Sequence, residues 1–428
     1  MKSLKQFSTY TLVGFIGAGV NFFLMPYLSH FLKPWEYGVL SMINSFVTIL
    51  IPLIGLSVAG YAKVEYYKYV NKDPKEFASI FSTVQVIPVI PFFIFLLLTI
   101  LLMHPLAAFL EIPQDKSYWI PLSALLAILT IYYETLIGFN VIEQRPGRYT
   151  FFVLLKLVIE VSLTVYFVTV LRYGWEGRLL AWVISTISMF IVSIIYFNKK
   201  RLLTKKIKKK YRIAALSFGV PLILHVIGKF VINQSDRVFI AKMVSIDEAG
   251  IYNIGYRVGM LILLFVGAVS NFIQPYVFER LADLNNRKRI QLVKMSYVII
   301  VGLLGVLLFI TFLAPLFFKY LVDHSYYEGI RYVFWTGLSY FFWGVYIVFT
   351  GYIFYYKKTK ILGYLAIVNV ALNIGLNYVL ISKFGAIGAA YATCISFFVV
   401  MIIVIWQSSL LVNLPWFEFK MIFNRHNK

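Results

Sequence analysis

The sequence predicts an all-α polytopic membrane protein with 12 transmembrane helices. Of its 428 residues, 61% are hydrophobic and 14% are charged. A soluble domain is roughly 45–50% apolar and about 25% charged, so this chain is too apolar to be one. A helix needs about 20 apolar residues to cross a bilayer, and most of the chain consists of such runs. Continuous runs also exclude a β-barrel, whose strands alternate polar and apolar residues.

Each expected span is one apolar run of the chain. The first run follows a short basic N-terminus, is too long for a signal-peptide core and lacks a small-x-small cleavage site, so we expect it to remain as the first span. The 12 runs lie near residues 8–31, 39–62, 79–103, 118–139, 149–171, 179–197, 213–235, 249–272, 295–318, 332–355, 361–382 and 386–411.

Lysine and arginine gather in alternate segments between the runs. If the N-terminus is cytoplasmic, the cytoplasmic segments hold 28 of these cations and the outward segments hold 9. Cytoplasmic segments carry the excess of positive charge in membrane proteins, so both termini are expected in the cytoplasm. This asymmetry accounts for most of the net charge of +22 without nucleic acid as a partner. The basic run at 199–212 is expected to lie on anionic membrane lipids.

Motifs for catalysis and metal binding are missing from the sequence. The single cysteine, Cys394, lies inside an apolar run, and the five histidines have no ligand spacing. We therefore expect no disulfide framework, no metal site and no cofactor. The segments between spans are too short to hold a catalytic domain of about 50 residues or more, so the protein is not expected to be an enzyme.

Short motifs repeat between the two halves of the chain. Six spans in each half is an even number, so both halves are expected to face the same way. We predict two parallel six-helix repeats around a central cavity, residues 1–205 and 206–428, joined by a basic inner linker at about 198–212. The matched positions are Glu36 and Glu248, Gly38 and Gly250, and Asn21 and Asn233, each 212 residues apart, and RYGWEG (172–177) and KFGAIG (383–388), which are 211 apart.

Five ionisable residues fall inside the expected spans. Charge is expensive in hydrocarbon, so such residues are candidates for function. The cations Arg257 and Lys229 are expected near the outer surface, and Lys156 near the inner end of its span. The acids are Glu134 and Glu160; Lys156 and Glu160 are four residues apart on one helix and can form an ion pair.

Residues 218–259, FGVPLILHVIGKFVINQSDRVFIAKMVSIDEAGIYNIGYRVG, resemble the seventh and eighth helices of a known exporter family. These are the polysaccharide-type flippases (Wzx-like, for O-antigen and capsule) of the multidrug/oligosaccharidyl-lipid/polysaccharide (MOP) exporter superfamily. The shared elements are F-G-x-P-L, N-x-x-D-R and G-x-Y, in that order. FLKPWEYGVLS (31–41), QPYVFERLAD (274–283) and NVALNIGLNYVLISKFGAIGAAYAT (369–393) also fit the pattern.

The resemblance implies a MATE-like fold of 12 or 14 helices in a bacterial inner membrane. It implies that the protein flips an undecaprenyl-diphosphate-linked oligosaccharide from the inner to the outer leaflet by alternating access. This chain has room for 12 helices and lacks the extra pair that lipid II flippases carry. Polysaccharide polymerase machinery is the candidate protein partner under this interpretation.

The in-span charges suit such a substrate. The lipid tail stays in the bilayer, so only the sugars and the anionic diphosphate cross. Arg257, Lys229 and Lys156 are the candidate diphosphate ligands; the alternative is that each cation pairs with a buried acid. Glu134 and Glu160 are interpreted as members of a structural ion-pair cluster or as carriers of a coupling H⁺ or Na⁺.

Other polar and helix-breaking positions have two interpretations each. Asn21 and Asn233 contact either substrate or a neighbouring helix. Asp236 and Arg237 are not expected to pair, because adjacent helix residues do not face each other. We interpret them as a cap of the seventh span that grips the 241–248 turn, or as a gate. Pro221 and Gly219 are expected to interrupt that helix, as a bending point or as a static kink.

Two alternative functions stay open from the sequence. A multidrug or cation antiporter of the same fold would favour a net acidic cavity, whereas the spans hold three cations and two acids. A membrane-embedded glycosyltransferase or polymerase would need an acid or base on an outward loop, and the sequence offers no convincing one.

Overall fold

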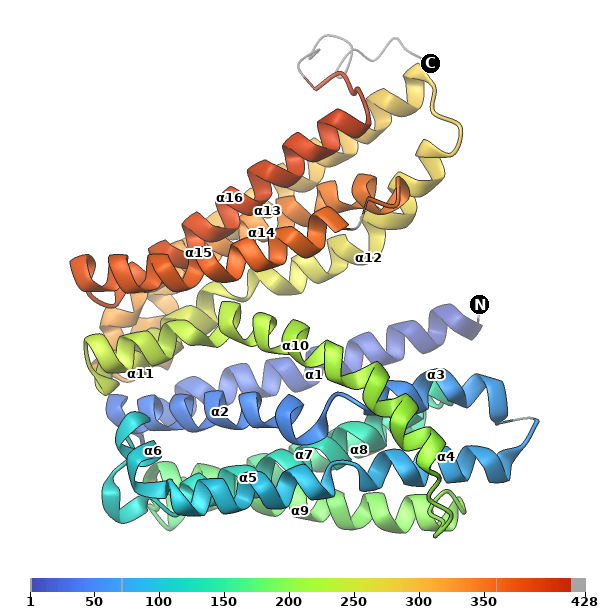
Figure 1. Cartoon of the computed structure of the whole chain (residues 1–428). Coiled ribbons are helices and arrows are strands. Elements are labelled where there is room, and N and C mark those ends of the chain that lie inside the picture. Colours follow the sequence, from blue (N-terminus) through green and yellow to red (C-terminus); the bar gives the residue numbers. More distant parts are fainter. Residues whose placement is uncertain (1, 71, 359, 417–428) are drawn as a thin grey trace. The chain divides into compact units, whose positions relative to one another are not determined.

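The computed structural model describes residues 2–70, 72–358 and 360–416, and nearly all of them are helical (Figure 1). In this part of the chain, 12 helical stretches are long and apolar enough to cross a membrane. Each of them overlaps one of the runs expected from the sequence. The predicted class, an all-α polytopic membrane protein with 12 spans, is confirmed.

Contacts divide the chain into two compact units, residues 1–234 and 235–428. The expected division into six-helix repeats at residue 205 stays a prediction. Unit 1 contains α1 (Lys2–Ser29), α2 (Pro34–Gly55), α3 (Ala59–Tyr69), α4 (Pro74–Val86), α5 (Val89–Leu101), α6 (Met103–Phe109), η1 (Gln114–Lys116), α7 (Trp119–Ile142), α8 (Pro146–Val165), the π-helix η2 (Tyr166–Val170), α9 (Gly174–Lys199) and the first part of α10 (Lys209–Met243). Unit 2 contains the rest of α10, α11 (Ile246–Gly259), α12 (Ile262–Leu281), α13 (Asn286–Leu321), η3 (His324–Gly329), α14 (Ile330–Tyr355), α15 (Lys360–Phe384) and α16 (Ile387–Leu411).

Each unit packs apolar helices around a few central ones. In unit 1 the span of α2 is 61% buried, whereas the span of α8 and η2 is 17% buried. In unit 2 the spans of α14 and α16 are each 61% buried, and α12 is 22% buried. The outer helices keep large apolar side chains exposed, such as Phe312 on α13. Such exposure is unfavourable in water and suits contact with lipid tails.

The repeated motifs RYGWEG and KFGAIG form equivalent turns in the two units. Gly174 and Gly385 both adopt left-handed backbone conformations, with φ of +58° and +68°. A Cβ on Gly388 would lie 2.2 Å from Leu380 O, and one on Gly177 would lie 3.0 Å from the Cβ of Phe167. Each motif thus needs one glycine for the turn and a second for close helix packing.

The other repeated motif makes different contacts in the two units. In unit 1, the Glu36 carboxylate accepts hydrogen bonds from the backbone N–H of Lys33 (2.9 Å) and of Trp175 (3.0 Å). It thereby joins the start of α2 to the start of α9. In unit 2, Glu248 instead forms an ion pair with Arg331 on α14.

Two expected spans differ from the observed ones. α2 ends at Gly55 instead of continuing to residue 62, because Leu56 and Ser57 are left-handed (φ 47° and 50°). The eighth candidate span is Ile262–Leu281, not 249–272, because a break after α11 separates the polar residues 246–259 from the apolar ones. Arg257 therefore lies in the last turn of α11 and not inside the apolar span.

α10 remains helical through Gly219 and Pro221, so neither residue ends it. Proline lacks an N–H, but the helix accommodates it. Gly219 has a different role in packing. A Cβ at this position would lie 2.3 Å from Leu56 O and 2.9 Å from Val58 N, so only glycine lets α10 lie against the α2–α3 junction. A role of either residue in bending stays a prediction.

Gly219→Ala is expected to destabilise the protein by about 1–3 kcal/mol, because the added methyl group overlaps backbone atoms that cannot move aside cheaply. Thermal unfolding in detergent measures the effect. Gly267→Ala on α12 is the matched control, since a Cβ there meets nothing within 4 Å, and it is expected to be neutral or stabilising. Equal effects of the two substitutions would contradict the packing role.

Candidate functional site

Unit 2 holds a buried ion pair on α10. Arg237 Nη1 lies 2.9 Å from Asp236 Oδ1, and the two side chains are 5% and 2% exposed. The expectation that these neighbours do not pair is wrong, because the long arginine side chain folds back to the short carboxylate. α10 continues to Met243, so neither residue caps it. The pair lies within the protein interior, where an isolated charge would be very costly.

Tyrosines from two other helices surround this pair. Tyr252 on α11 donates a hydrogen bond to Asp236 Oδ2 (2.6 Å). The Arg237 guanidinium lies 4.3 Å from the ring centre of Tyr256, a distance suited to a cation–π interaction. The Tyr256 hydroxyl is hydrogen-bonded to that of Tyr340 on α14. The pair and its tyrosines therefore hold α10, α11 and α14 together. In the sequence, this arrangement is indicated by two tyrosines four residues apart in α11, which lie on the same face of the helix.

Asn253 links the buried pair to Arg257. Asn253 Oδ1 accepts from Arg237 Nε and from Arg257 Nε, each at 3.4 Å. Arg257 is half-buried, and its position in the last turn of α11 places its charge near the negative end of the helix dipole. The side chains of Lys229 and Asn233 lie outside the described residues, so their proximity to Arg257 stays a prediction.

A ladder of three asparagines lies on α15 of the same unit. Asn369, Asn373 and Asn377 are 3%, 1% and 0% exposed. Asn377 Nδ2 donates to Asn373 Oδ1 (3.0 Å), and Asn373 Nδ2 donates to Thr393 on α16 (3.4 Å). Ser235 on α10 bonds to Asn373 as well (3.4 Å). The sequence NVALNIGLN shows the asparagines at a spacing of four. They are not among the predicted site residues, because that prediction considers charged residues within spans and asparagine is uncharged.

Unit 1 holds a second charged cluster, on α8 and α9. Lys156 forms the expected ion pair with Glu160. Arg178 adds a contact that the sequence does not indicate: its Nη2 lies 2.8 Å from Glu160 Oε1, and its Nη1 donates to Thr164 (2.9 Å). Arg178 was expected in an outward segment, but it lies on α9. One carboxylate thus serves two cations, which leaves excess positive charge.

The remaining predicted site residues of unit 1, Glu134 and Asn21, form no hydrogen bond or ion pair with Lys156 or Glu160 in the part of the chain that the structure describes. Glu134 is exposed on α7, and within the described residues its carboxylate is not among the ion-pair partners of Lys156. Asn21 is exposed on α1, and its amide nitrogen donates to the backbone oxygen of Gly17 (2.9 Å). The structure therefore brings together Lys156 and Glu160, and separately Asp236 and Arg237 with Arg257 through Asn253.

A family model described as "Polysaccharide biosynthesis protein" matches residues 3–281. The chain belongs to this polysaccharide biosynthesis family. Two proteins of Haemophilus influenzae are similar to this chain in sequence. An "Uncharacterized membrane protein" is 25% identical over 385 residues, which cover 88% of this chain and 89% of the relative. "Lsg locus putative protein 1" is 25% identical over 371 residues, 85% of this chain and 87% of the relative.

Solved structures show which fold this member of the family has. A "Lipid II flippase MurJ, inward closed conformation" superposes with a TM-score of 0.71 at 16% identity, over 93% of this chain and 87% of the other. A multidrug resistance MATE family transporter of the MOP superfamily, in an inward-facing conformation, gives 0.69 at 12% identity, over 95% and 97%. The predicted MATE-like fold is confirmed, and with the 12 apolar helices it indicates a multi-pass membrane protein.

Arg237→Ala is expected to destabilise the protein by about 3–5 kcal/mol, because it leaves the buried Asp236 carboxylate without its cation. Thermal unfolding in detergent is the measurement. Lys288→Ala is the control: it breaks an ion pair with Asp283, whose side chain is 72% exposed, and should cost less than about 1 kcal/mol. Equal losses would mean that the pair contributes no more than a surface pair.

Glu160→Gln is expected to cost about 1–3 kcal/mol, because Lys156 and Arg178 lose the carboxylate that both contact. Lys156→Ala leaves the pair of Arg178 and Glu160 intact and should cost less than about 1 kcal/mol. The comparison uses the same unfolding assay. If Lys156→Ala proves the more damaging change, the carboxylate is not the centre of the cluster.

Proposed function

We propose that the protein flips an undecaprenyl-diphosphate-linked oligosaccharide from the inner to the outer leaflet of a bacterial cytoplasmic membrane by alternating access. The polysaccharide biosynthesis family supports the saccharide part of the substrate. The likeness to a lipid II flippase supports the fold. We infer from that flippase's name that the cargo of this chain is also linked to a lipid. Both termini are taken to be cytoplasmic, as the charge distribution predicts.

The observation that carries the proposal is cationic side chains held in polar networks of the described helices. Arg257 is half-buried on α11 and is held through Asn253. Lys156 and Arg178 share one carboxylate, so that cluster keeps net positive charge. A diphosphate is a multiply charged anion that arginine binds bidentately and lysine binds as a point charge. The substrate's lipid tail stays in the bilayer, so the protein needs polar contacts only for the head.

Coupling to an ion is an additional proposal. Glu160 is compensated by two cations, so it fits a structural ion pair better than a carrier. Glu134, exposed on α7, is the better candidate to bind a proton or Na⁺ during transport. A membrane potential that is negative inside also favours outward movement of an anion, by about 2.3 kcal/mol per charge per 100 mV.

The alternative is a multidrug or cation antiporter of the same fold. The structural likeness to a multidrug resistance MATE family transporter is compatible with it, although this likeness concerns the fold alone. A cationic drug would need uncompensated acids, and the cluster on α8 and α9 instead holds two cations to one acid.

Arg257→Ala is expected to slow saccharide export by about tenfold or more, because the loss of one charge-assisted contact costs about 1.5–3 kcal/mol. Mass spectrometry of lipid extracts measures it: cells whose only copy is the variant should accumulate an isoprenoid-diphosphate saccharide. Arg257→Lys should restore part of the export, since it keeps the charge.

Lys383→Ala is the matched control, since it removes an exposed cation at the end of α15 and should leave export unchanged. If depleted cells accumulate no such lipid and retain cationic dyes instead, the antiporter function replaces the flippase.

A further inference from the structure

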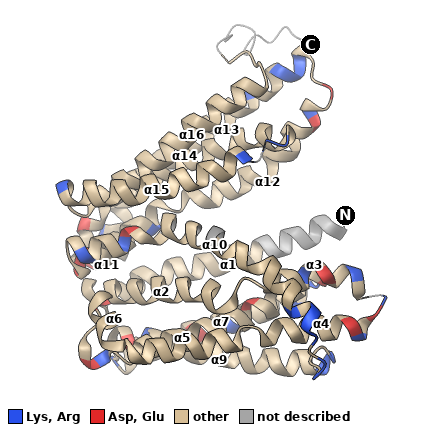
Figure 2. Ribbon diagram, viewed as in Figure 1, with Lys and Arg blue, Asp and Glu red and all other residues tan. Residues whose placement is uncertain are grey.

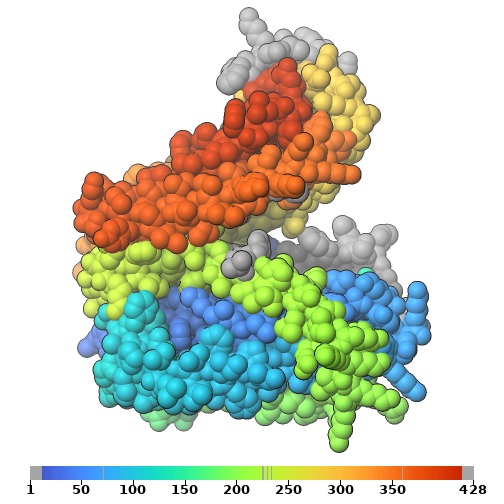
Figure 3. Space-filling view, viewed as in Figure 1, coloured from blue at the N-terminus to red at the C-terminus, as the bar shows by residue number. Residues whose placement is uncertain are grey.

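The basic segment 199–212, which connects α9 to α10, is hydrogen-bonded to residues 79–83 of α4. Hydroxyl groups of α4 bond to its backbone, and in the space-filling view the segment lies in front of part of the blue α3–α4 region (Figure 3). The bonds join Ser79 Oγ to Lys206 O (2.6 Å), Ser82 Oγ to Leu202 O (2.8 Å) and to Thr204 N (2.8 Å), and Thr83 Oγ1 to Lys208 N (3.3 Å). The three hydroxyl-bearing residues are buried, so these bonds fix the course of the backbone.

Two glutamates bind three of the nine cations of this segment. Glu76 at the start of α4 pairs with Lys208 and with Lys210, the latter at 3.1 Å, and accepts a hydrogen bond from the Tyr211 hydroxyl. Glu143 at the end of α7 pairs with Lys200. These three lysines therefore anchor the segment to two different helices of unit 1.

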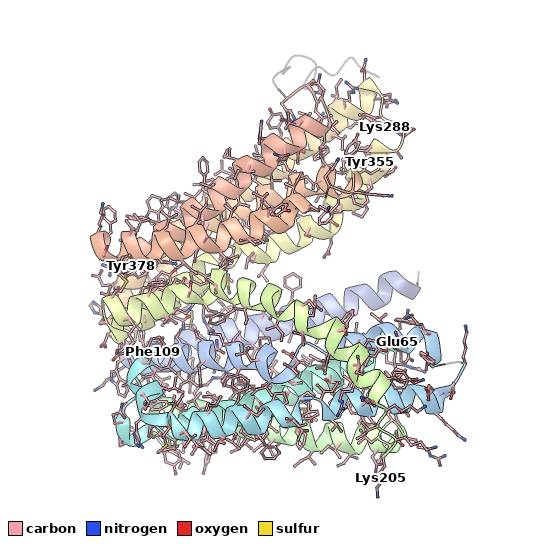
Figure 4. All side chains as sticks on the ribbon, viewed as in Figure 1. Glu65, Phe109, Lys205, Lys288, Tyr355 and Tyr378 are labelled. Carbon is pink, nitrogen blue, oxygen red and sulfur yellow. The ribbon has the colours of Figure 1, made fainter. Side chains whose placement is uncertain are left out.

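The other six cations point outward. Figure 2 shows the ribbon coloured blue for lysine and arginine beside α4, and the labelled Lys205 side chain projects away from the ribbon in Figure 4. Two apolar side chains between them, Leu203 and Ile207, are 36% and 49% exposed. All six cations are exposed: Lys199, Arg201, Lys205, Lys206, Lys209 and Arg212; Lys210 is exposed too, although it pairs with Glu76.

The segment is placed at a membrane surface by the helices on either side of it. The candidate span of α9 ends at Lys199, and the next span begins at Lys209. A short fastened connection between two spans has to lie at the level of the lipid headgroups. Exposed lysines there meet phosphates, and exposed apolar side chains meet the upper part of the acyl chains.

We propose that residues 199–212 form a preorganised binding surface for the headgroups of anionic phospholipids. Glu76 and Glu143 pair with three cations and so fix the course of the segment, and the other six cations bind lipid phosphates. Fixing the loop in advance lowers the ordering cost that a flexible basic segment would bear on binding. This site does not involve the candidate ligands of the transported substrate, so the lipid-binding proposal can be tested separately from the flippase function.

The first test is lipid binding to the purified full-length protein in nanodiscs of phosphatidylcholine with a minor fraction of fluorescent phosphatidylglycerol. Lys205→Ala with Lys206→Ala should reduce enrichment of the anionic lipid around the protein at least fivefold, since each basic residue near the surface contributes about that factor. Lys33→Ala with Lys383→Ala removes the same charge from exposed positions elsewhere and should change enrichment little. Equal losses in both double variants would overturn the site.

The second test separates preorganisation from charge alone. Glu76→Gln makes the protein more positive but releases the anchor of Lys208, Lys210 and Tyr211. Weaker phosphatidylglycerol enrichment in this variant is the expected result; stronger enrichment would mean that net charge alone attracts the lipid. Inorganic phosphate is the competitor that identifies the source: if millimolar phosphate displaces the lipid fully, the surface is a general anion site and the lipid assignment is wrong.

Discussion

The constraint on which this structure depends is that a charge removed from water has to be compensated where it lies. Asp236 and Arg237 show how far that requirement shapes unit 2. The carboxylate has both its arginine and the Tyr252 hydroxyl, and the guanidinium lies over the ring of Tyr256. These contacts come from different helices, so compensating the charge also fixes α10 against α11. A polar feature that is costly on its own thus becomes a tertiary constraint.

Glycine at repeated positions sets the second constraint, which is steric. The turn before α9 and the turn before α16 use the same pair of glycines, one left-handed and one at a close helix contact. Gly219 meets the same kind of requirement between α10 and the left-handed residues that follow α2. Helices can approach closely without a hydrophobic driving force in lipid only where side chains are small, so these positions determine how each unit packs.

Sequence patterns predict the parts of this structure that depend on local properties. Apolar runs locate 12 spans, because the requirement for length and hydropathy acts along the chain. The pair of Lys156 and Glu160 follows from helical spacing alone. Arg178 could not be found this way, because its contact with Glu160 depends on how α9 packs on α8. The sequence analysis does not predict the pairing of Asp236 with Arg237, because it assumes that adjacent residues of a helix cannot meet. The arginine side chain is long enough to fold back to its neighbour.

The eighth span was misplaced for a related reason, and the correction bears on function. Hydropathy alone extends the span back to residue 249. In the structure, Asn253 on α11 accepts hydrogen bonds from Arg257 on the same helix and from Arg237 of the buried pair on α10. α11 therefore precedes the apolar span, and Arg257 in its last turn is hydrogen-bonded to Asn253. A half-buried cation with polar contacts of this kind keeps its charge without the full desolvation cost. The cluster on α8 and α9 also keeps cations in a partly buried place. There, Lys156 and Arg178 share the single carboxylate of Glu160, which cannot neutralise both. In unit 1, a cluster of two cations and one acid suits an anionic ligand better than a cationic one, so the ratio of cations to acids matters more than the number of charges.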